Sequence, residues 1–402
     1  NMLINRQITK ELKNHLAKKE MTLLLGPRQS GKSTVLKYLE SKLKKDGKRT
    51  VFLNLDILAD KEKLADQTEF INFLRSLSLG KKHYIFIDEV QRIPEAGIFL
   101  KGVYDSNLNC KFILSGSSSL EIKNKIVEPL TGRKRTFYLP TLTFEEFINF
   151  KAPDLKNLSV IKLSFRKKIL LLLDEYLRFG GYPRVVIEEN HQEKVKILEE
   201  IYTSYIEKDI ELFFEVRNKS SFLKLVNILA AELGGLLNKD AISAEIGSNR
   251  LTIDNFLNYL QASFVINLLS PFFSRPRREI IKSPKVYFSD TGLRNLMVKN
   301  FSPLETRTDK GQLFENFILK EISLKLGPTE KINYWRTRIG AEVDFVLSRG
   351  KEVLAGIEVK ANSRQNLKPE IAMKSFIEKY APEQIYLLNF LNFYKISKFN
   401  LN

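Results

Sequence analysis

The stretch Leu23-Leu-Leu-Gly-Pro-Arg-Gln-Ser-Gly-Lys-Ser-Thr34 decides the fold, because an apolar run enters a glycine-containing loop that leads directly into a helical pattern. Its spacing Gly26-x-x-x-x-Gly31-Lys32-Ser33 is that of a phosphate-binding loop, although a chance Gly/Ser turn before a helix is the alternative. The glycines let backbone N–H groups point at phosphate oxygens. Lys32 supplies charge for the β- and γ-phosphates, and the Ser33 hydroxyl suits Mg²⁺. The residues predicted to bind ATP and Mg²⁺ here are Gly26, Pro27, Arg28, Gln29, Ser30, Gly31, Lys32, Ser33 and Thr34.

The overall composition indicates a soluble, basic, multidomain chain. Its 402 residues exceed one ordinary core, so two or three domains are expected. The 65 Lys and Arg residues outnumber the 47 Asp and Glu residues, which gives a net charge of +18. This excess favours a polyanionic partner, with nucleic acid ahead of a membrane surface. Solubility or a generally lysine-rich proteome would give the same excess.

Cysteine and histidine are too few for disulfide or zinc chemistry. The single Cys110 excludes an intramolecular disulfide and a cysteine-based zinc site. His15, His83 and His191 lack the spacing of metal ligands. The chain shows neither a signal-peptide pattern nor an apolar run long enough to span a bilayer, so we expect a cytoplasmic protein without a membrane partner.

Strand and helix patterns alternate as far as about residue 139, which predicts a parallel sheet with helices on both faces. The run Tyr84-Ile-Phe-Ile-Asp88-Glu89 reads as a buried strand that ends in two acids. Asp88 is predicted to hold Mg²⁺, and Glu89 to orient the attacking water. Two solvated acids at a strand end are the alternative.

Two further polar groups are candidates for the same site. Ser115 ends the next apolar strand, where it can hydrogen-bond the γ-phosphate or the water, while an N-cap among the following serines is the alternative. Arg133, in Leu130-Thr-Gly-Arg133-Lys-Arg135, is a candidate arginine finger for a neighbouring subunit of a homo-oligomer. Arg135 is its rival, and a surface arginine is the alternative.

The segment up to about Phe150 resembles an AAA-type ATPase module. The whole chain resembles a prokaryotic ATPase family in which this module is joined to a C-terminal domain of uncharacterised function with a restriction-endonuclease-like core. The resemblance rests on the motifs above and on Leu139-Pro-Thr-Leu-Thr-Phe-Glu-Glu-Phe147, Phe179-Gly-Gly-Tyr-Pro183, Ser283-Pro-Lys-Val-Tyr-Phe-Ser-Asp-Thr-Gly-Leu293 and Ile357-Glu-Val-Lys360. It implies ATP binding.

The expected architecture is therefore an α/β P-loop NTPase with an AAA-type parallel sheet, followed by three further parts. The predicted domains are the ATPase at 1–150, a helical lid at 151–237, a winged-helix domain at 238–300 and a restriction-endonuclease-like domain at 301–402. The loop Phe179–Pro183 is assigned hinge or packing duty, since Gly and Pro punctuate structure.

The winged-helix prediction comes from a short helix that ends at Gly247, a second helix from about Arg250 to Gln261, and two strands joined by a basic segment. Arg250, Thr252, Asn255, Asn258 and Tyr259 are expected on the exposed face of the second helix. The residues predicted to contact DNA are Arg250, Asn255, Arg275, Arg277, Arg278 and Lys282. A protein-binding winged helix is the alternative.

The last hundred residues read as helix, three strands, helix and strand, the core order of restriction-type nucleases. Glu358 and Lys360 lie two apart on one strand, so both should face Asp344 on its neighbour. Asp344, Glu358 and Glu315 are predicted to bind Mg²⁺ and Lys360 to stabilise the transition-state charge. Val343 departs from the proline that often precedes the aspartate.

These patterns together predict an ATP-hydrolysing, DNA-associated protein in which nucleotide state controls DNA binding or processing. Two alternatives remain for the C-terminal domain. It either only binds DNA or a protein, or it is an active Mg-dependent nuclease.

Overall fold

The computed structural model describes residues 4–78, 81–117, 126, 128–155, 165–205, 219–273 and 283–398. The chain forms two compact units. The N-terminal unit comprises Asn1–Leu142 with Asn258–Val265, and the C-terminal unit comprises Thr143–Leu257 with Ile266–Asn402.

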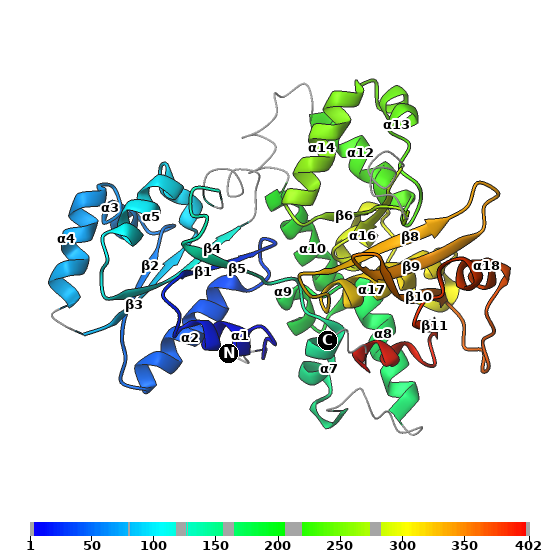
Figure 1. Ribbon diagram of the computed structural model, residues 1–402, viewed down its shortest axis with the longest axis horizontal. Helices are drawn as coiled ribbons and strands as arrows, with labels where there is room; N and C mark the ends of the chain where they lie inside the picture. Colours follow the sequence, from blue (N-terminus) through cyan, green and yellow to red (C-terminus); the bar gives the residue numbers. More distant parts are fainter. Residues whose placement is uncertain are drawn as a thin grey trace. The chain divides into compact units, whose positions relative to one another are not determined.

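The N-terminal unit contains a five-stranded sheet in the order β2-β3-β4-β1-β5, in which all neighbouring strands are parallel (Figure 1). This is the parallel α/β sheet that the alternating pattern predicts. Its elements are α1 (Thr9–His15), β1 (Met21–Gly26), α2 (Lys32–Lys45), β2 (Arg49–Asn54), α3 (Leu58–Glu62), α4 (Gln67–Ser78), β3 (His83–Asp88), the 3₁₀ helix η1 (Val90–Arg92), α5 (Ala96–Asp105), β4 (Cys110–Ser117) and β5 (Lys134–Tyr138).

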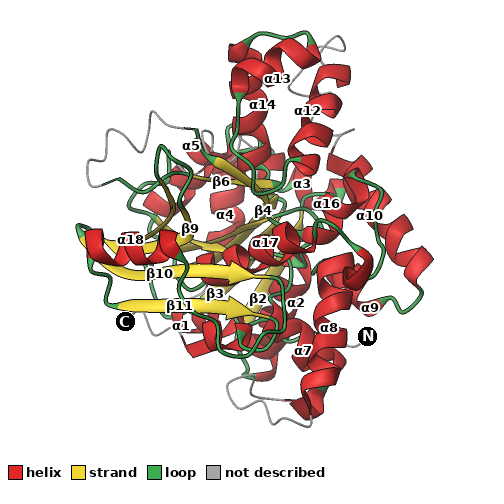
Figure 2. Ribbon diagram, turned by 90° about the vertical axis from the view of Figure 1, so that its right-hand side faces the viewer, coloured by secondary structure: helices red, strands yellow, loops and turns green. Residues whose placement is uncertain are grey.

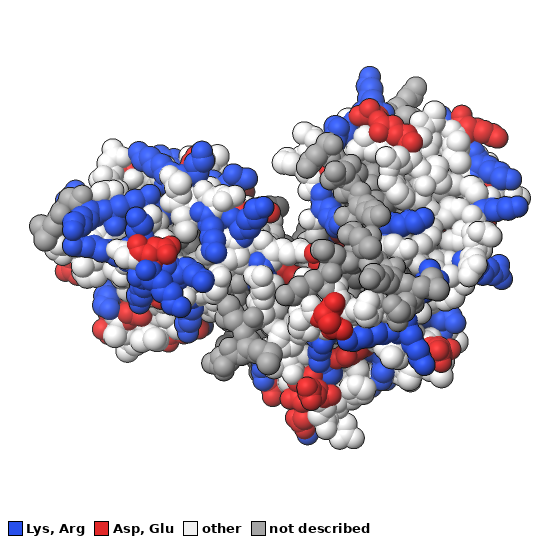
Figure 3. Space-filling model, turned by 90° about the horizontal axis from the view of Figure 1, so that it is seen from below, with Lys and Arg blue, Asp and Glu red and all other residues white. Residues whose placement is uncertain are grey.

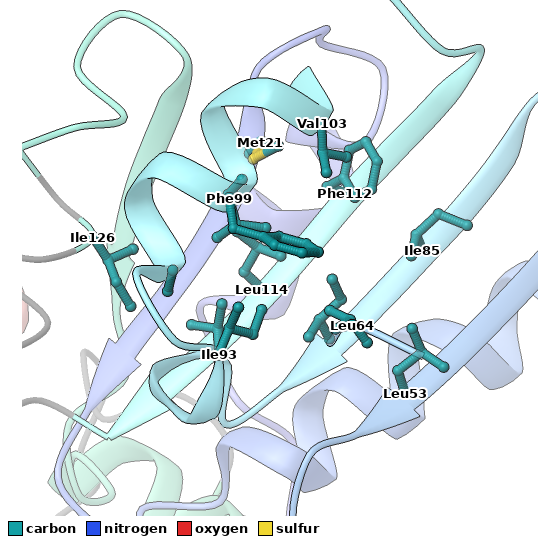
Figure 4. Close-up of a cluster of buried hydrophobic side chains, with 14 of the residues drawn as sticks. Met21, Leu53, Leu64, Ile85, Ile93, Phe99, Val103, Phe112, Leu114 and Ile126 are labelled. Atoms are coloured by element: carbon teal, nitrogen blue, oxygen red, sulfur yellow. The ribbon is translucent and has the colours of Figure 1, made fainter. Parts of the chain in front are cut away.

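Apolar side chains cover both faces of this sheet. One cluster joins the sheet to α4 and α5 and includes Phe70, Ile85, Phe99 and Leu114 (Figure 4). A second cluster joins the opposite face to α1 and α2. Figure 1 accordingly shows α2 on one side of the sheet and α5 on the other. Because β1, β3 and β4 are buried on both faces, their sequences are almost continuously apolar.

The C-terminal unit is built from helices, a four-stranded sheet in the order β11-β10-β9-β8 and a two-stranded antiparallel pair, β6-β7. In the larger sheet β10 is parallel to β11 and antiparallel to β9, and β8 is antiparallel to β9. Figure 2 shows α18 along one face of this sheet. The helices are α7 (Phe144–Lys151), α8 (Arg166–Phe179), α9 (Pro183–Ile187), α10 (His191–Tyr205), α12 (Lys219–Ala231), α13 (Lys239–Ile246), α14 (Arg250–Ala262), α16 (Thr291–Met297), α17 (Lys310–Ser323) and α18 (Ile371–Tyr380).

The strands of this unit are β6 (Ile266–Leu269), β7 (Lys285–Phe288), β8 (Glu330–Arg336), β9 (Glu342–Arg349), β10 (Glu352–Lys360) and β11 (Gln384–Asn389). Its 3₁₀ helices are η3 (Pro153–Leu155), η8 (Leu304–Thr306) and η9 (Phe393–Lys398). The succession α17, β8, β9, β10, α18, β11 is the helix, three strands, helix and strand that the sequence indicates.

An aromatic cluster forms the centre of the C-terminal unit. The ring of Phe144 on α7 lies 5.3 Å from that of Tyr176 on α8 and 5.5 Å from that of Phe317 on α17. Phe393 of η9 completes the group, 5.7 Å from Phe144. Since the four residues come from distant parts of the sequence, their packing joins the start of this unit to its end.

Two glycine-containing motifs are joined by one buried carboxylate. Gly180 has a φ of +76°, and a Cβ there would lie 1.9 Å from Oδ1 of Asp290. Gly181 donates its N–H to Oδ2 of Asp290 at 2.9 Å, while the other carboxylate oxygen caps α16 by accepting from the backbone of Gly292 at 3.0 Å. The loop Phe179–Pro183 therefore serves packing in this structure.

Two local expectations differ from the structure. The sequence from Arg6 to Glu20 has the pattern of a basic amphipathic helix that leads to the first strand, but α1 ends at His15 and a turn precedes β1. Tyr259 was expected on the exposed face of α14, but it is 2% exposed. Its ring is large and mostly apolar, so burial outweighs its place in the helical pattern.

Among the described residues, no helix has both the length and the apolar character needed to cross a bilayer.

The carboxyl of Glu321 predicts a pH-dependent stability. Burial raises its pKa from 4.5 to about 7, although Lys320 and the N–H of Phe144, which donates to it at 3.0 Å, oppose the shift. Between pH 4.5 and 7 the folded chain holds a proton that the unfolded chain releases, so stability is lost as pH rises through this window. As the pH rises from 4.5 to 7, we expect the unfolding free energy of the wild type, measured relative to that of Glu321→Gln, to fall by on the order of 3 kcal/mol.

Urea unfolding at a series of pH values measures this difference. The exposed Glu378→Gln variant is the control, and we expect its difference from the wild type to stay flat across the same range. An equally flat profile for Glu321→Gln would contradict the prediction.

Candidate nucleotide site and a second acidic cluster

The loop between β1 and α2 has the backbone that a phosphate-binding loop needs. Gln29 and Gly31 have φ values of 58° and 95°, in the left-handed region. The first helical turn closes when Val35 donates its N–H to the carbonyl of Gly31 at 3.0 Å. The N–H groups that begin α2 have no partner within the helix itself, and they therefore suit an anion.

Lys32 crosses the loop from the first turn of α2. Its Nζ donates to the carbonyl oxygens of Gly26 at 3.1 Å and Pro27 at 2.8 Å. Burial lowers the pKa of this ammonium to about 8, while the charges of Glu89 and Asp88 oppose the shift. The ammonium is therefore held at the base of the loop, within electrostatic range of the two acids.

The strand register places the second half of the site beside the loop. Gly26 pairs with Ser117 and Leu24 with Ser115, so the carboxyl ends of β1 and β4 are adjacent. The parallel pairing of β3 with β4 brings Asp88 next to Ser115, whose hydroxyl donates to the aspartate carboxylate. Since neighbouring strands lie about 4.8 Å apart, the loop and the acids are two strand spacings apart.

Glu89 makes a contact that the sequence did not reveal. Its carboxylate accepts from the amide nitrogen of Gln91, and that nitrogen also donates to Oγ of Ser117 at 2.9 Å. The nitrogen assignment follows from the carboxylate, which can only accept. The other end of the amide, Oε1 of Gln91, is buried without a hydrogen-bond partner among the described residues. The only signal for Gln91 in the sequence is its place two residues after Glu89, in the run Ile87-Asp-Glu-Val-Gln91.

Arg6 is a second residue that motif spacing missed. The residue is 6% exposed, and its guanidinium donates to the carbonyl of Ser30 in the phosphate-binding loop at 2.7 Å. It also donates to the carbonyl of Pro140 at 2.6 Å, just after β5. A Cβ on Gly26 would lie 2.1 Å from the carbonyl oxygen of Leu139, so this segment packs directly on the loop. Arg6 thus links the phosphate-binding loop to the segment that follows β5.

Arg133 lies at the other edge of the sheet, immediately before β5. Its Nε and one terminal nitrogen donate to the two carboxylate oxygens of Asp105 at 2.8 and 3.0 Å. The pair lowers the pKa of Asp105 and raises that of Arg133. Within one chain Arg133 is therefore remote from the loop, and its predicted role as an arginine finger requires a neighbouring subunit.

The C-terminal unit holds a second acidic cluster around Lys285 of β7. Nζ of Lys285 lies 3.3 Å from Oε1 of Glu315 and 2.5 Å from Oε1 of Glu342. The hydroxyl of Tyr287 donates to Glu315 as well. Asp344 belongs to the same cluster. Burial, and after it the charge of Glu315, raises the pKa of the Asp344 carboxyl well above its usual range. The carboxylate accepts a hydrogen bond from the N–H of Val359 at 2.7 Å, which opposes this shift.

Glu358 and Lys360 contact each other as their spacing predicts. Nζ of Lys360 lies 2.9 Å from Oε1 of Glu358 and 2.9 Å from Oε1 of Glu370, while Oε2 of Glu358 is buried without a hydrogen-bond partner. Asp344 and Glu315 come together, but the described residues contain no group of three or more His, Cys, Asp or Glu side chains that could hold a metal ion. The ammonium of Lys285 already pairs with Glu315. The magnesium site of Asp344, Glu358 and Glu315 stays a prediction.

The predicted DNA-binding residues are only partly described. Asn255 is exposed on α14, and the exposed Arg250 lies 3.3 Å from the carboxylate of Asp240. The four residues of the predicted wing tip, Arg275, Arg277, Arg278 and Lys282, lie outside the described residues.

Three family profiles match parts of the chain. Residues 18–148 match an AAA domain, residues 170–304 match a domain of unknown function (DUF8612), and residues 310–398 match a domain of unknown function (DUF4143). The first match agrees with the loop and the parallel sheet. It supports an AAA-type ATPase family and nucleotide binding for the N-terminal unit.

Relatives with similar sequences are uncharacterized proteins of distant organisms. One from Mycobacterium tuberculosis is 26% identical over 371 residues, which cover 91% of this chain and 76% of that protein. One from Methanocaldococcus jannaschii is 27% identical over 362 residues, which cover 88% of this chain and 77% of that protein.

Solved structures give weaker similarities. The replication initiator DnaA bound to AMPPCP and single-stranded DNA aligns with a TM-score of 0.31 and 17% identity over 64% of this chain and 90% of that one. AMPPCP-bound DnaA from Aquifex aeolicus aligns with a TM-score of 0.33 and 15% identity over 63% of this chain and 86% of that one. These scores are too low to support an argument.

Arg6 generates a prediction for nucleotide binding. Arg6→Ala removes two hydrogen bonds that hold the phosphate-binding loop and the segment after β5, so we expect about tenfold weaker ATP binding, equivalent to ~1.4 kcal/mol. Arg6→Lys should recover part of the affinity, since an ammonium can reach one of the two carbonyls. Titration with a fluorescent ATP analogue measures both. Lys10→Ala, an exposed change on α1, is the control, and an Arg6→Ala affinity equal to that control would refute the assignment.

Proposed function

We propose that this protein binds and hydrolyses ATP and couples its nucleotide state to DNA binding or processing. The observation that carries the ATPase part is that the loop containing Lys32, at the carboxyl end of β1, and the acids Asp88 and Glu89, at the end of β3, lie at the same edge of the sheet, two strand spacings apart. This is the edge of a parallel sheet where ligands bind. The AAA domain match covers the same residues.

The groups present fit a nucleotide and Mg²⁺. A buried ammonium and the first N–H groups of a helix suit a triphosphate. The Ser33 hydroxyl and the Asp88 carboxylate are oxygen ligands of the type that Mg²⁺ takes. Bound there, Mg²⁺ would neutralise phosphate charge. Lys32 would bind the β- and γ-phosphates, and Ser115 would orient Asp88 through the hydrogen bond already formed.

Glu89 is the proposed residue that orients the attacking water. Its carboxylate accepts a hydrogen bond from the amide nitrogen of Gln91, and that nitrogen also donates to Oγ of Ser117. These contacts hold the carboxylate at the end of β3. We therefore add Gln91, as a positioning residue, to the residues that support hydrolysis. Arg133 of another subunit would supply the charge of an arginine finger.

The proposed role in DNA association rests on the net charge of +18 and on the helix pair α13–α14 followed by the β6-β7 pair, the arrangement of a winged helix. In this reading 1–150 is the ATPase domain, 151–237 the lid, 238–300 the winged helix and 301–402 the nuclease-like domain.

For the C-terminal domain we favour binding without cleavage over an active nuclease. Lys285 pairs with two carboxylates, Glu315 and Glu342, of the acidic cluster, so part of the negative charge of that cluster is already offset by the chain itself. An active Mg-dependent nuclease using Asp344, Glu358 and Lys360 remains the second candidate, because Glu358 keeps an unpartnered buried oxygen.

Substitutions in the nucleotide site test the ATPase proposal. Lys32→Ala removes the ammonium that binds the phosphates, so we expect nucleotide binding and turnover to be abolished. Gln91→Ala should leave ATP affinity near normal and lower kcat about tenfold, equivalent to ~1.4 kcal/mol in the barrier, because Glu89 loses its positioning partner. Phosphate release and equilibrium binding measure the two effects. Unchanged ATPase activity in Lys32→Ala would remove the proposed site.

A gel assay decides between binding and cleavage. Labelled duplex, branched and single-stranded DNA are incubated with the protein, with and without ATP and with Mg²⁺ or Mn²⁺. We expect shifted bands without new products, and Asp344→Ala should bind like the wild type. Metal-dependent products that disappear in Asp344→Ala would instead establish the nuclease.

A further inference from the structure

We propose that the edge of the N-terminal sheet opposite the nucleotide is a binding surface for the phosphate backbone of duplex DNA. This amino edge consists of the segments that lead into the five parallel strands, residues 16–20, 48–49, 81–83, 105–111 and 131–135. The inference rests on the proposed DNA association, for which it names a surface within the ATPase unit.

Each of the five strands begins next to a cation. Because all the strands are parallel, their first residues lie at one edge, while the phosphate-binding loop lies at the other. The sheet order therefore sets a row of basic groups side by side along this edge. In that order they are Lys48 and Arg49 at β2, Lys81 and Lys82 at β3, Lys111 at β4, Lys18 and Lys19 at β1, and Arg133, Lys134 and Arg135 at β5.

Contacts between the segments show that they form one surface. Nζ of Lys82 donates to the carbonyl of Leu16 at 3.4 Å, which joins the segments before β3 and β1. Nζ of Lys19 donates to Oδ1 of Asn107 at 3.0 Å, which joins the segments before β1 and β4. The N–H of Met21 donates to the carbonyl of Arg133 at 2.8 Å, so the approach to β5 is joined as well.

Most of these cations are available to a partner. Lys111 is buried, and Arg133 is paired with Asp105. The exposed basic side chains of the edge are Lys18, Lys19, Lys48, Arg49, Lys81, Lys82 and Arg135. In the same segments the acids are only Glu20 and Asp105, and the second of these is already paired. The edge therefore carries a strong excess of positive charge.

The distribution of charge along the chain agrees with this placement. Residues 1–142 contain 26 Lys and Arg against 15 Asp and Glu, and residues 1–50 alone contain 13 against 4. Eight of the 15 acids fall between residues 56 and 95. The only part of the amino edge in this range is the segment 81–83, and it contains none of these acids. Figure 3 shows Lys and Arg side chains predominating on the face of the N-terminal unit that it presents.

The dimensions suit a duplex rather than a small anion. Five strands about 4.8 Å apart make a row about 19 Å long. Duplex DNA carries one charge per about 1.7 Å of its axis, so the stretch of duplex that such a row spans carries roughly eleven phosphates on its two strands, and those on the near side face the row. A single phosphate or nucleotide would engage only one or two of the cations.

Two of the exposed lysines of the amino edge lie over aromatic rings. Nζ of Lys19 lies 5.8 Å from the ring centre of Tyr104, and Nζ of Lys82 lies 5.3 Å from that of Tyr84. These rings hold the ammonium groups in place from below. Since contacts to phosphates carry no sequence information, binding here is independent of DNA sequence.

The experiment neutralises two exposed lysines from different segments, Lys18→Gln with Lys81→Gln. The matched control, Lys61→Gln with Lys351→Gln, removes the same charge from α3 and from the turn between β9 and β10, where both lysines are also exposed. Binding of a fluorescent duplex of mixed sequence is measured at several salt concentrations. Equilibrium binding of ATP, whose site lies at the other edge, verifies folding.

The slope of log K against log salt is negative, and we expect its magnitude to fall by about 1.8 in the edge variant, at 0.9 per lost phosphate contact, and to stay unchanged in the control. Affinity should fall equally for unrelated sequences, and ATP affinity should not change. Equal slopes for the edge variant and the control overturn the assignment of this edge while leaving DNA association intact. A wild-type protein that binds phosphatidylserine vesicles but no DNA overturns both.

Discussion

The buried ammonium of Lys32 is the constraint on which the N-terminal unit depends. It is held by two carbonyls of its own loop, and such a charge is costly to bury unless it is hydrogen-bonded and close to opposite charge. The loop supplies the carbonyls and the end of β3 supplies the carboxylates. Arg6 then fixes the loop against the segment after β5. The geometry of the site is therefore built around one lysine.

The C-terminal unit solves a similar problem with the opposite sign. Its buried carboxylates, Asp290 and the cluster around Asp344, are satisfied by backbone N–H groups and by Lys285. Both arrangements bring together distant segments of the chain, from Phe179 to Asp290 and from Lys285 to Glu342. Carboxylates that are used in this way hold the packing of the unit together, which leaves less of the acidic cluster for a metal.

Local patterns predicted the parallel sheet and the loop, because an apolar strand, a glycine turn and the start of a helix are specified by neighbouring residues. The partners of the catalytic candidates could not be predicted. Gln91 bonds Ser117 across 26 positions and Arg6 bonds Pro140 across 134 positions, and no spacing rule links such pairs. Lys285 was missed because a lysine at the start of a short strand reads as solvated. The exposure of Tyr259 was predicted wrongly because helical periodicity does not show whether an aromatic side chain at the border of the apolar face is buried or exposed to solvent.

A parallel sheet also separates two sets of phosphates. Strands of five to eight residues at about 3.3 Å per residue place its two edges roughly 17–26 Å apart. The Debye length at physiological ionic strength is about 8 Å, so charges at one edge are largely screened from the other across solvent. ATP at the carboxyl ends and a polyanion at the amino ends would thus not compete. Any coupling between them would have to pass through the strands and helices, which contact both edges.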